Sequence, residues 1–84
     1  MNSRHRKTLE AIFAEPTRAN LFFADIEVLF VALGAEIREG AGSRITVGCQ
    51  GRRAYFHRPH PGKEARKYQV EDAREFLRKL GAMP

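Results

Sequence analysis

The chain has 84 residues, a hydrophobic content of 43% and a formal net charge of +5. These values predict one small folded domain with a thin core, and they argue against a disordered or multidomain protein. The single cysteine, Cys49, excludes an internal disulfide, and no apolar run approaches the ~20 residues that a membrane-spanning helix needs. We therefore expect a cytoplasmic protein.

The charges divide the sequence into an acidic part and a basic part. Residues 21–39 hold four acids and one arginine, whereas residues 44–67 hold seven cations and one acid. A basic half predicts a polyanionic partner, of which nucleic acid is the commonest. The alternative is a charged surface that serves only solubility.

Two helices are predicted in the first part of the chain. Residues 1–16 favour a helix with Ser3 as its N-cap and Pro16 as its stop. Residues 21–34 favour a second helix that ends at Gly34. Its predicted core positions follow helical spacing: Phe22, Ile26, Leu29, Phe30 and Leu33.

Three short strands and a last helix complete the predicted fold. The strands cover residues 35–39, 43–49 and 52–57, with Gln50-Gly51 as a two-residue hairpin turn. The helix covers residues 68–81, and its apolar stripe consists of Val70, Ala73, Phe76, Leu77 and Leu80. This order predicts an α+β fold, a three-stranded antiparallel sheet with helices on one face.

Four short segments stand in a definite order and spacing: Leu33 to Ala35, Gly42-Ser43, Pro59-His60 and Leu77 to Gly81. Together they resemble the HicA family of bacterial toxins. The resemblance covers roughly residues 22–81. We expect a single domain of residues 1–84, with residues 21–81 as its core and the helix of residues 1–16 as an addition.

The resemblance implies a double-stranded-RNA-binding-like α-β-β-β-α fold and a ribonuclease that cuts mRNA without a metal ion or other cofactor. It also implies a HicB-like antitoxin as the inhibitory partner. The usual catalytic histidine of the family directly follows the Gly-Ser pair. This chain departs from that pattern, because Arg44 stands there.

Cleavage of RNA without a metal requires a base for the 2′-hydroxyl, an acid for the leaving oxygen and cations for the phosphorane. Histidine suits both proton transfers because its ordinary pKa lies near neutrality. We expect His60, held between two prolines, as the first catalytic candidate, and His57 at the end of a strand as the second. The predicted RNA-binding residues are Ser43, Arg44, Arg53, Arg58 and Lys63.

Alternatives stay open at this point. His57 fits packing at a sheet edge as well as proton transfer, and Tyr55 and Tyr68 fit either packing or base stacking. Cys49, His57 and His60 are too few and too scattered for a structural zinc site. Arg44 favours an RNA-binding module that does not cut, and the apolar residues 21–23 together with the first helix suggest a protein adaptor.

Overall fold

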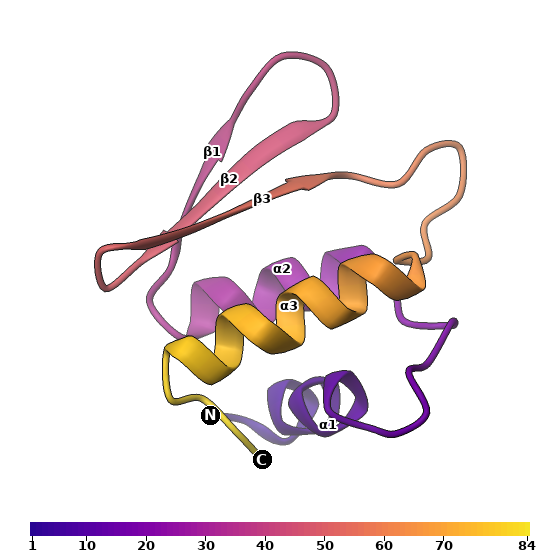
Figure 1. Cartoon of the computed structure of the whole chain (residues 1–84), viewed down its shortest axis with the longest axis vertical. Coiled ribbons are helices and arrows are strands. Elements are labelled where there is room, and N and C mark those ends of the chain that lie inside the picture. Colours follow the sequence, from indigo (N-terminus) through magenta and orange to yellow (C-terminus); the bar gives the residue numbers. More distant parts are fainter.

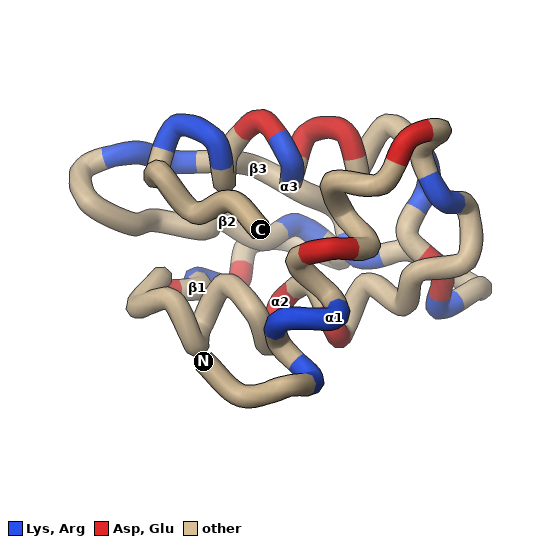
Figure 2. The backbone as a smooth tube through the Cα atoms, turned by 90° about the horizontal axis from the view of Figure 1, so that it is seen from below, with Lys and Arg blue, Asp and Glu red and all other residues tan.

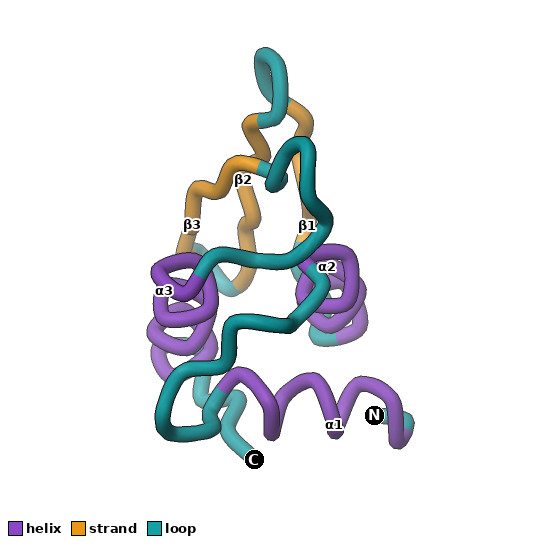
Figure 3. Tube along the Cα trace, turned by 90° about the vertical axis from the view of Figure 1, so that its right-hand side faces the viewer, coloured by secondary structure: helices purple, strands orange, loops and turns teal.

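The computed structural model describes all 84 residues and confirms the predicted order of elements. The elements are α1 (Ser3–Ile12), α2 (Phe23–Ala32), β1 (Glu36–Glu39), β2 (Arg44–Cys49), β3 (Arg52–His57) and α3 (Lys67–Lys79). The strands form one antiparallel sheet in the order β1-β2-β3. Helices α2 and α3 cover one face of this sheet, and α1 crosses beneath them as a third layer (Figures 1 and 3). No helix is long and apolar enough to cross a membrane.

The core joins the sheet to the two helices through a chain of aromatic rings. Phe30 of α2 lies 5.9 Å from Phe56 of β3 and 5.6 Å from Phe76 of α3, measured between ring centroids. Phe23 contacts Phe56 edge to face at 5.7 Å. Such pairs add roughly 0.5–1.5 kcal/mol each to the burial of their surface. The α2–β3–α3 contact therefore holds the sheet rigidly against the helical layer.

The turn between β2 and β3 sets the register on which the site depends. Gln50 and Gly51 both have positive φ, 52° and 75°, as a type I′ hairpin requires. The turn pairs Cys49 with Arg52 and, at the far end of the hairpin, Arg44 with His57. The same register sends Ile45, Val47 and Phe56 into the core. The hairpin prediction is confirmed.

Helix α1 is attached to the rest of the fold by a buried arginine. Arg74 of α3 donates from Nε to the carbonyl oxygen of Ile12 at 2.9 Å, and from Nη2 to the carbonyl of Ala14 at 3.3 Å and to Thr17 Oγ1 at 3.0 Å. The last carbonyls of a helix lack intrahelical partners. Arg74 supplies hydrogen-bond donors to the carbonyls at the end of α1. Arg74 itself is only 8% exposed.

Two predictions about the helix ends are wrong. The N-cap of α1 is Asn2, whose side-chain oxygen accepts from the backbone N–H of His5 at 2.8 Å. Ser3 is the first helical residue instead. Phe22 lies before α2 in extended conformation and is 51% exposed, and its neighbour Phe23 takes the core position. The backbone of Phe22 pairs with Glu64 in an isolated bridge, outside the helix whose spacing predicts a core position for its side chain.

Candidate nucleic-acid interface

The face of the sheet that the helices leave uncovered is polar and basic. Side chains alternate along each strand, and residues paired across an antiparallel sheet point to the same face. The β2–β3 hairpin carries three arginines and no acid, whereas the acids of this half of the chain gather in α3 (Figure 2). We call this uncovered surface the outer face; its residues are Glu36, Arg38, Arg44, Thr46, Gly48, Arg53, Tyr55 and His57.

His57 and Arg44 form one end of the outer face. They are paired across β2 and β3. The backbone N–H of Arg58 bonds the carbonyl of Ser43 at 2.8 Å, so the neighbouring Arg44–His57 pair is a non-hydrogen-bonded one. Side chains lie closer together in such pairs. The imidazole and the guanidinium therefore share one small area of exposed surface.

The position of His57 is supported by two polar contacts. Nδ1 of its ring lies 3.4 Å from Ser43 Oγ, a weak contact in which the donor depends on the ring tautomer. Its backbone carbonyl accepts from the buried Gln69 Nε2 at 2.6 Å. Gln69 Oε1 in turn accepts from the backbone N–H of Arg66 at 3.0 Å. The second ring nitrogen of His57 has no partner within the chain and is open to a ligand.

Arg44 is presented by the turn that joins β1 to β2. Gly40 donates its backbone N–H to the Arg44 carbonyl at 2.8 Å, and Arg44 donates to Ala41 at 3.2 Å. A Cβ at position 40 would approach the Cβ of Arg44 to 3.2 Å, which is why glycine suits this close turn. The side chain of Arg44 is exposed and takes part in none of the ion pairs within the chain.

The prediction that Arg58 binds phosphate does not fit the geometry. Its guanidinium already donates to Glu27 of α2 at 2.6 and 3.1 Å and to Glu39 of β1 at 2.7 and 2.8 Å. These carboxylates raise the pKa of Arg58 above its ordinary value, mainly through hydrogen bonding by Glu27. The hydrogen bond from Arg58 lowers the pKa of Glu39. Arg58 therefore joins α2, β1 and β3 at the inner edge of the sheet.

His60 and Lys63 lie in the segment between β3 and α3, not on the outer face. This segment turns from the end of β3 toward the helical layer (Figure 1). Its later part is tied to the start of α2, where Phe23 donates to the Lys63 carbonyl at 3.0 Å and Ala65 donates to Leu21 at 2.7 Å. His60 is exposed and makes no hydrogen bond. Strand pairing and the Ser43–His57 contact thus bring together Ser43, Arg44 and His57, and no hydrogen bond joins His60 to them.

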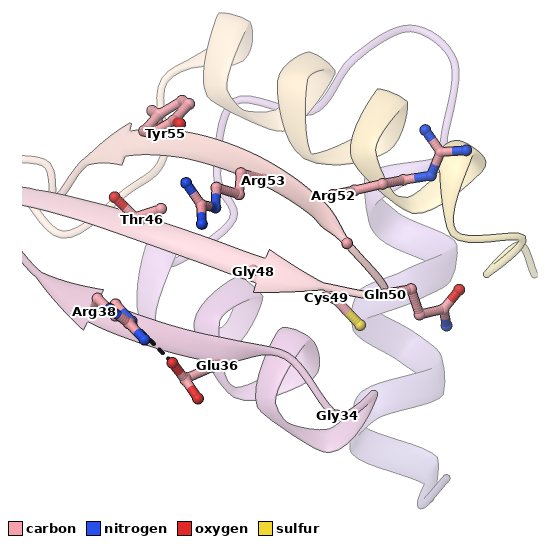
Figure 4. A pocket seen from close by; sticks show the side chains of 11 residues that line it. Gly34, Glu36, Arg38, Thr46, Gly48, Cys49, Gln50, Arg52, Arg53 and Tyr55 are labelled. Carbon is pink, nitrogen blue, oxygen red and sulfur yellow. Dashed lines mark hydrogen bonds and ion pairs between the residues drawn. The ribbon is translucent and has the colours of Figure 1, made fainter.

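A depression of about 700 Å³ continues the outer face beyond Tyr55. Gly48 of β2 lies between Glu36 of β1 and Arg53 of β3. Figure 4 shows the side chains of Thr46, Arg53 and Tyr55 above the sheet. Arg52 extends away from them toward the end of α3.

Sequence reasoning missed Gly48 and Gln69. A glycine inside a strand is a signal for close backbone approach, and a glutamine at the third position of a helix is a signal for a contact with its N-terminus.

The comparisons with known proteins address the family. A family model described as the HicA toxin of bacterial toxin–antitoxin matches residues 23–82, from α2 through α3, and leaves α1 outside. No curated protein and no solved structure matches the chain. The observed order α-β-β-β-α, with its three-stranded antiparallel sheet, fits the double-stranded-RNA-binding-like fold of that family. Since the family model covers well over half of the chain, the protein belongs to the HicA family of toxins from bacterial toxin–antitoxin systems.

Proposed function

We propose that this toxin is a cytoplasmic endoribonuclease that cuts mRNA without a metal ion and is neutralised by a HicB-like antitoxin. The observation that carries the proposal is the pairing of His57 with Arg44. The family resemblance implies a catalytic histidine at position 44. Here an imidazole lies directly opposite that position, on the neighbouring strand. We propose that His57 takes the role of that histidine from the neighbouring strand, on the same area of the surface.

The proposed reaction starts at the unpartnered ring nitrogen of His57. This nitrogen takes the proton of an RNA 2′-hydroxyl, and the 2′-oxygen then attacks the adjacent phosphorus. The bond from phosphorus to the 5′-oxygen breaks, and that oxygen leaves with a proton from solvent. Arg44 contacts the non-bridging oxygens, where its guanidinium stabilises the charge of the phosphorane through paired hydrogen bonds.

The outer face also supports the proposed mode of inhibition. Its arginines and histidine are exposed, and an acidic surface of an antitoxin would be attracted to them before contact. An antitoxin bound there would cover His57 and Arg44 together. Ser43 and Arg53 remain proposed RNA contacts on this face, Lys63 is a proposed contact beside it, and His60 remains a second catalytic candidate in the loop.

A single experiment tests the ribonuclease proposal. Purified protein is incubated with end-labelled mRNA and excess chelator, alongside His57→Ala and His60→Ala variants. We expect cleavage to survive the chelator and to fall by roughly 100- to 10,000-fold in His57→Ala, the usual contribution of a general base. His60→Ala tests the second candidate in the same assay. His5→Ala, in α1 and outside the family match, is the matched control and should cut within a few-fold of the parent. Undiminished cleavage by His57→Ala would reject His57 as the base.

A second function, RNA binding without cleavage, is favoured by Arg44 itself. Arginine cannot act as a general base because it stays protonated in proteins. If His57 does not replace the family histidine, the chain would bind RNA on its outer face and leave it intact. The same experiment distinguishes the two functions, because RNA that is retained by the protein and uncut by it would support the binding module.

A further inference from the structure

Tyr55 is the most exposed aromatic side chain of the protein, and it lies in the middle of a strand. The residue is 69% exposed, compared with 4% for its strand neighbour Phe56. Across the sheet it is paired with Thr46, which is in turn paired with Arg38. No helix or loop covers this row. A large ring left uncovered on the outer face of the edge strand β3 has no role in packing the core.

The floor of the depression beside Tyr55 is open because Gly48 has no side chain. A Cβ at this position would meet only one atom, the carbonyl oxygen of Arg52, at 4.0 Å. The backbone of Gly48 also lacks the positive φ that would require glycine. The fold therefore accepts a larger residue at position 48, and glycine has the effect of letting a ligand approach the strand.

The charges around Tyr55 are available to a ligand. Arg53 and Arg44 are exposed and take part in none of the ion pairs of the chain. Arg38 is paired with Glu36 at 2.9 Å, but the two side chains are 78% and 71% exposed, so the pair is easily exchanged for another partner. His57 and Arg53 flank Tyr55 two residues away on the same strand and on the same face.

An exposed aromatic ring between unpaired arginines suits a nucleic acid whose bases are free. Unpaired bases stack on aromatic side chains while arginines hold the backbone, whereas the bases of a duplex are already stacked and are bound mainly by shape. We propose that the outer face binds an unpaired RNA strand, with one base stacked on Tyr55, phosphates on Arg44 and Arg53, and the neighbouring nucleotide over Gly48.

This inference rests on the proposed RNA-directed function and specifies its substrate as single-stranded RNA. The stacked base would place the adjoining phosphate near Arg44 and His57, which form the next cross-strand pair on the same face of the sheet. Tyr55 and Gly48 would then position RNA for cleavage without taking part in proton transfer. The double-stranded-RNA-binding-like fold would serve an unpaired strand here, through its sheet.

Binding is measured with a fluorescein-labelled 2′-O-methyl RNA of about 12 nucleotides and no internal pairing, and with the same strand annealed to its complement. The blocked 2′-oxygen cannot attack the phosphate, so binding is observed without cleavage. We expect the single strand to bind at least tenfold more tightly than the duplex. Tyr55→Ala should weaken single-strand binding by roughly 5- to 100-fold, the usual effect of losing one base–aromatic stack.

Matched variants separate stacking from general disturbance. Tyr55→Phe keeps the ring and should bind within about twofold of the parent. Tyr68→Ala removes a tyrosine of 56% exposure at the start of α3, away from the outer face, and should also bind normally. Gly48→Val should weaken binding by filling the floor, and thermal unfolding of each variant confirms that it is folded.

The outcomes distinguish this inference from the ribonuclease proposal. Tyr55-dependent binding without cleavage of natural RNA would reject the ribonuclease and leave the inference standing. Three results would overturn the inference, even if natural RNA is cut. They are equal affinity for the single strand and the duplex, unchanged single-strand affinity in Tyr55→Ala, and a loss of affinity in Tyr68→Ala equal to that in Tyr55→Ala. Absence of any RNA binding, including the case where this face binds only an acidic protein, would overturn it as well.

Discussion

Four arginines of this protein fall into two pairs that differ in what surrounds them. Arg44 and Arg53 lie exposed on the outer face and contact no acid. Arg58 and Arg74 lie at the joints between elements, where carboxylates and carbonyl oxygens occupy their guanidinium groups. A charge count treats all four alike. The comparison indicates that the same residue type serves two purposes. Some arginines form a basic surface for a ligand, and others hold the elements of the fold together.

Arg74→Met should produce the largest change in stability. The substitution keeps an apolar stem but leaves the carbonyls of Ile12 and Ala14 at the end of α1 without donors. We expect the free energy of unfolding to fall by about 2–4 kcal/mol, and Tm by roughly 10 °C or more in a domain of this size. Urea and thermal unfolding measure the effect.

The matched control for this variant is Arg78→Met, one helical turn further along α3. Arg78 lies 3.7 Å from Glu75 and over the ring of Phe13, with half of its side chain exposed. Its loss should cost less than about 1 kcal/mol. Comparable losses in the two variants would show that Arg74 is no special brace for α1.

Arg58→Gln is expected to lower stability by less, about 1–2 kcal/mol, while RNA binding changes by no more than about twofold. The change leaves the carboxylate of Glu27, only 18% exposed, without its cation. Solvent reaches the Glu39 side of the network, which limits the loss. Unfolding and RNA titration are measured on the same preparation. A strong loss of RNA affinity with unchanged stability would place Arg58 with the exposed arginines.

Arg53→Gln should show the reverse pattern, with unchanged stability and weaker RNA binding. Removing one phosphate contact should lower affinity several-fold and reduce the slope of log K against log salt by about 0.7, the value for a single strand. Titrations at several salt concentrations measure both quantities. Arg18→Gln, which removes an equal charge from an exposed loop before α2, is the control and should leave the slope unchanged.

The sequence was sufficient for the elements and for the outer face, because local patterns determine both. Alternation along β2 and β3 and the Gln50-Gly51 turn predict which side chains point outward, and this register pairs Arg44 with His57. The same reasoning failed for Arg58, whose partners Glu27 and Glu39 are 31 and 19 residues away in the chain.

These local patterns did not predict contacts between elements that are far apart in the sequence. The bond from Arg74 to the end of α1 spans 62 residues and depends on how two helices cross. The path of the loop that carries His60 depends on the anchoring of Lys63 and Ala65 beside α2. No periodicity or turn signal encodes either contact, so neither could be predicted from the sequence.

The smallest expected effect concerns the pH dependence of the brace at Arg58. The hydrogen bond from Arg58 holds the pKa of Glu39 below its ordinary 4.5. A carboxyl whose pKa is lowered by folding adds stability above its unfolded pKa and loses that contribution as the pH falls through the folded value. Glu39→Gln should therefore be slightly less stable than the parent at neutral pH, and the two should converge well below pH 4.5.

Urea unfolding at about pH 7, 5, 4 and 3 measures this convergence. Glu36→Gln provides the control on the same strand, because the Glu36–Arg38 pair is exposed on both sides and contributes little at any pH. A constant gap between parent and Glu39→Gln across this range would mean that the Glu39 carboxylate is no part of the brace. A gap that closes only in Glu39→Gln would assign the acid-sensitive part of the stability to the Arg58–Glu39 contact and none of it to the exposed Glu36–Arg38 pair.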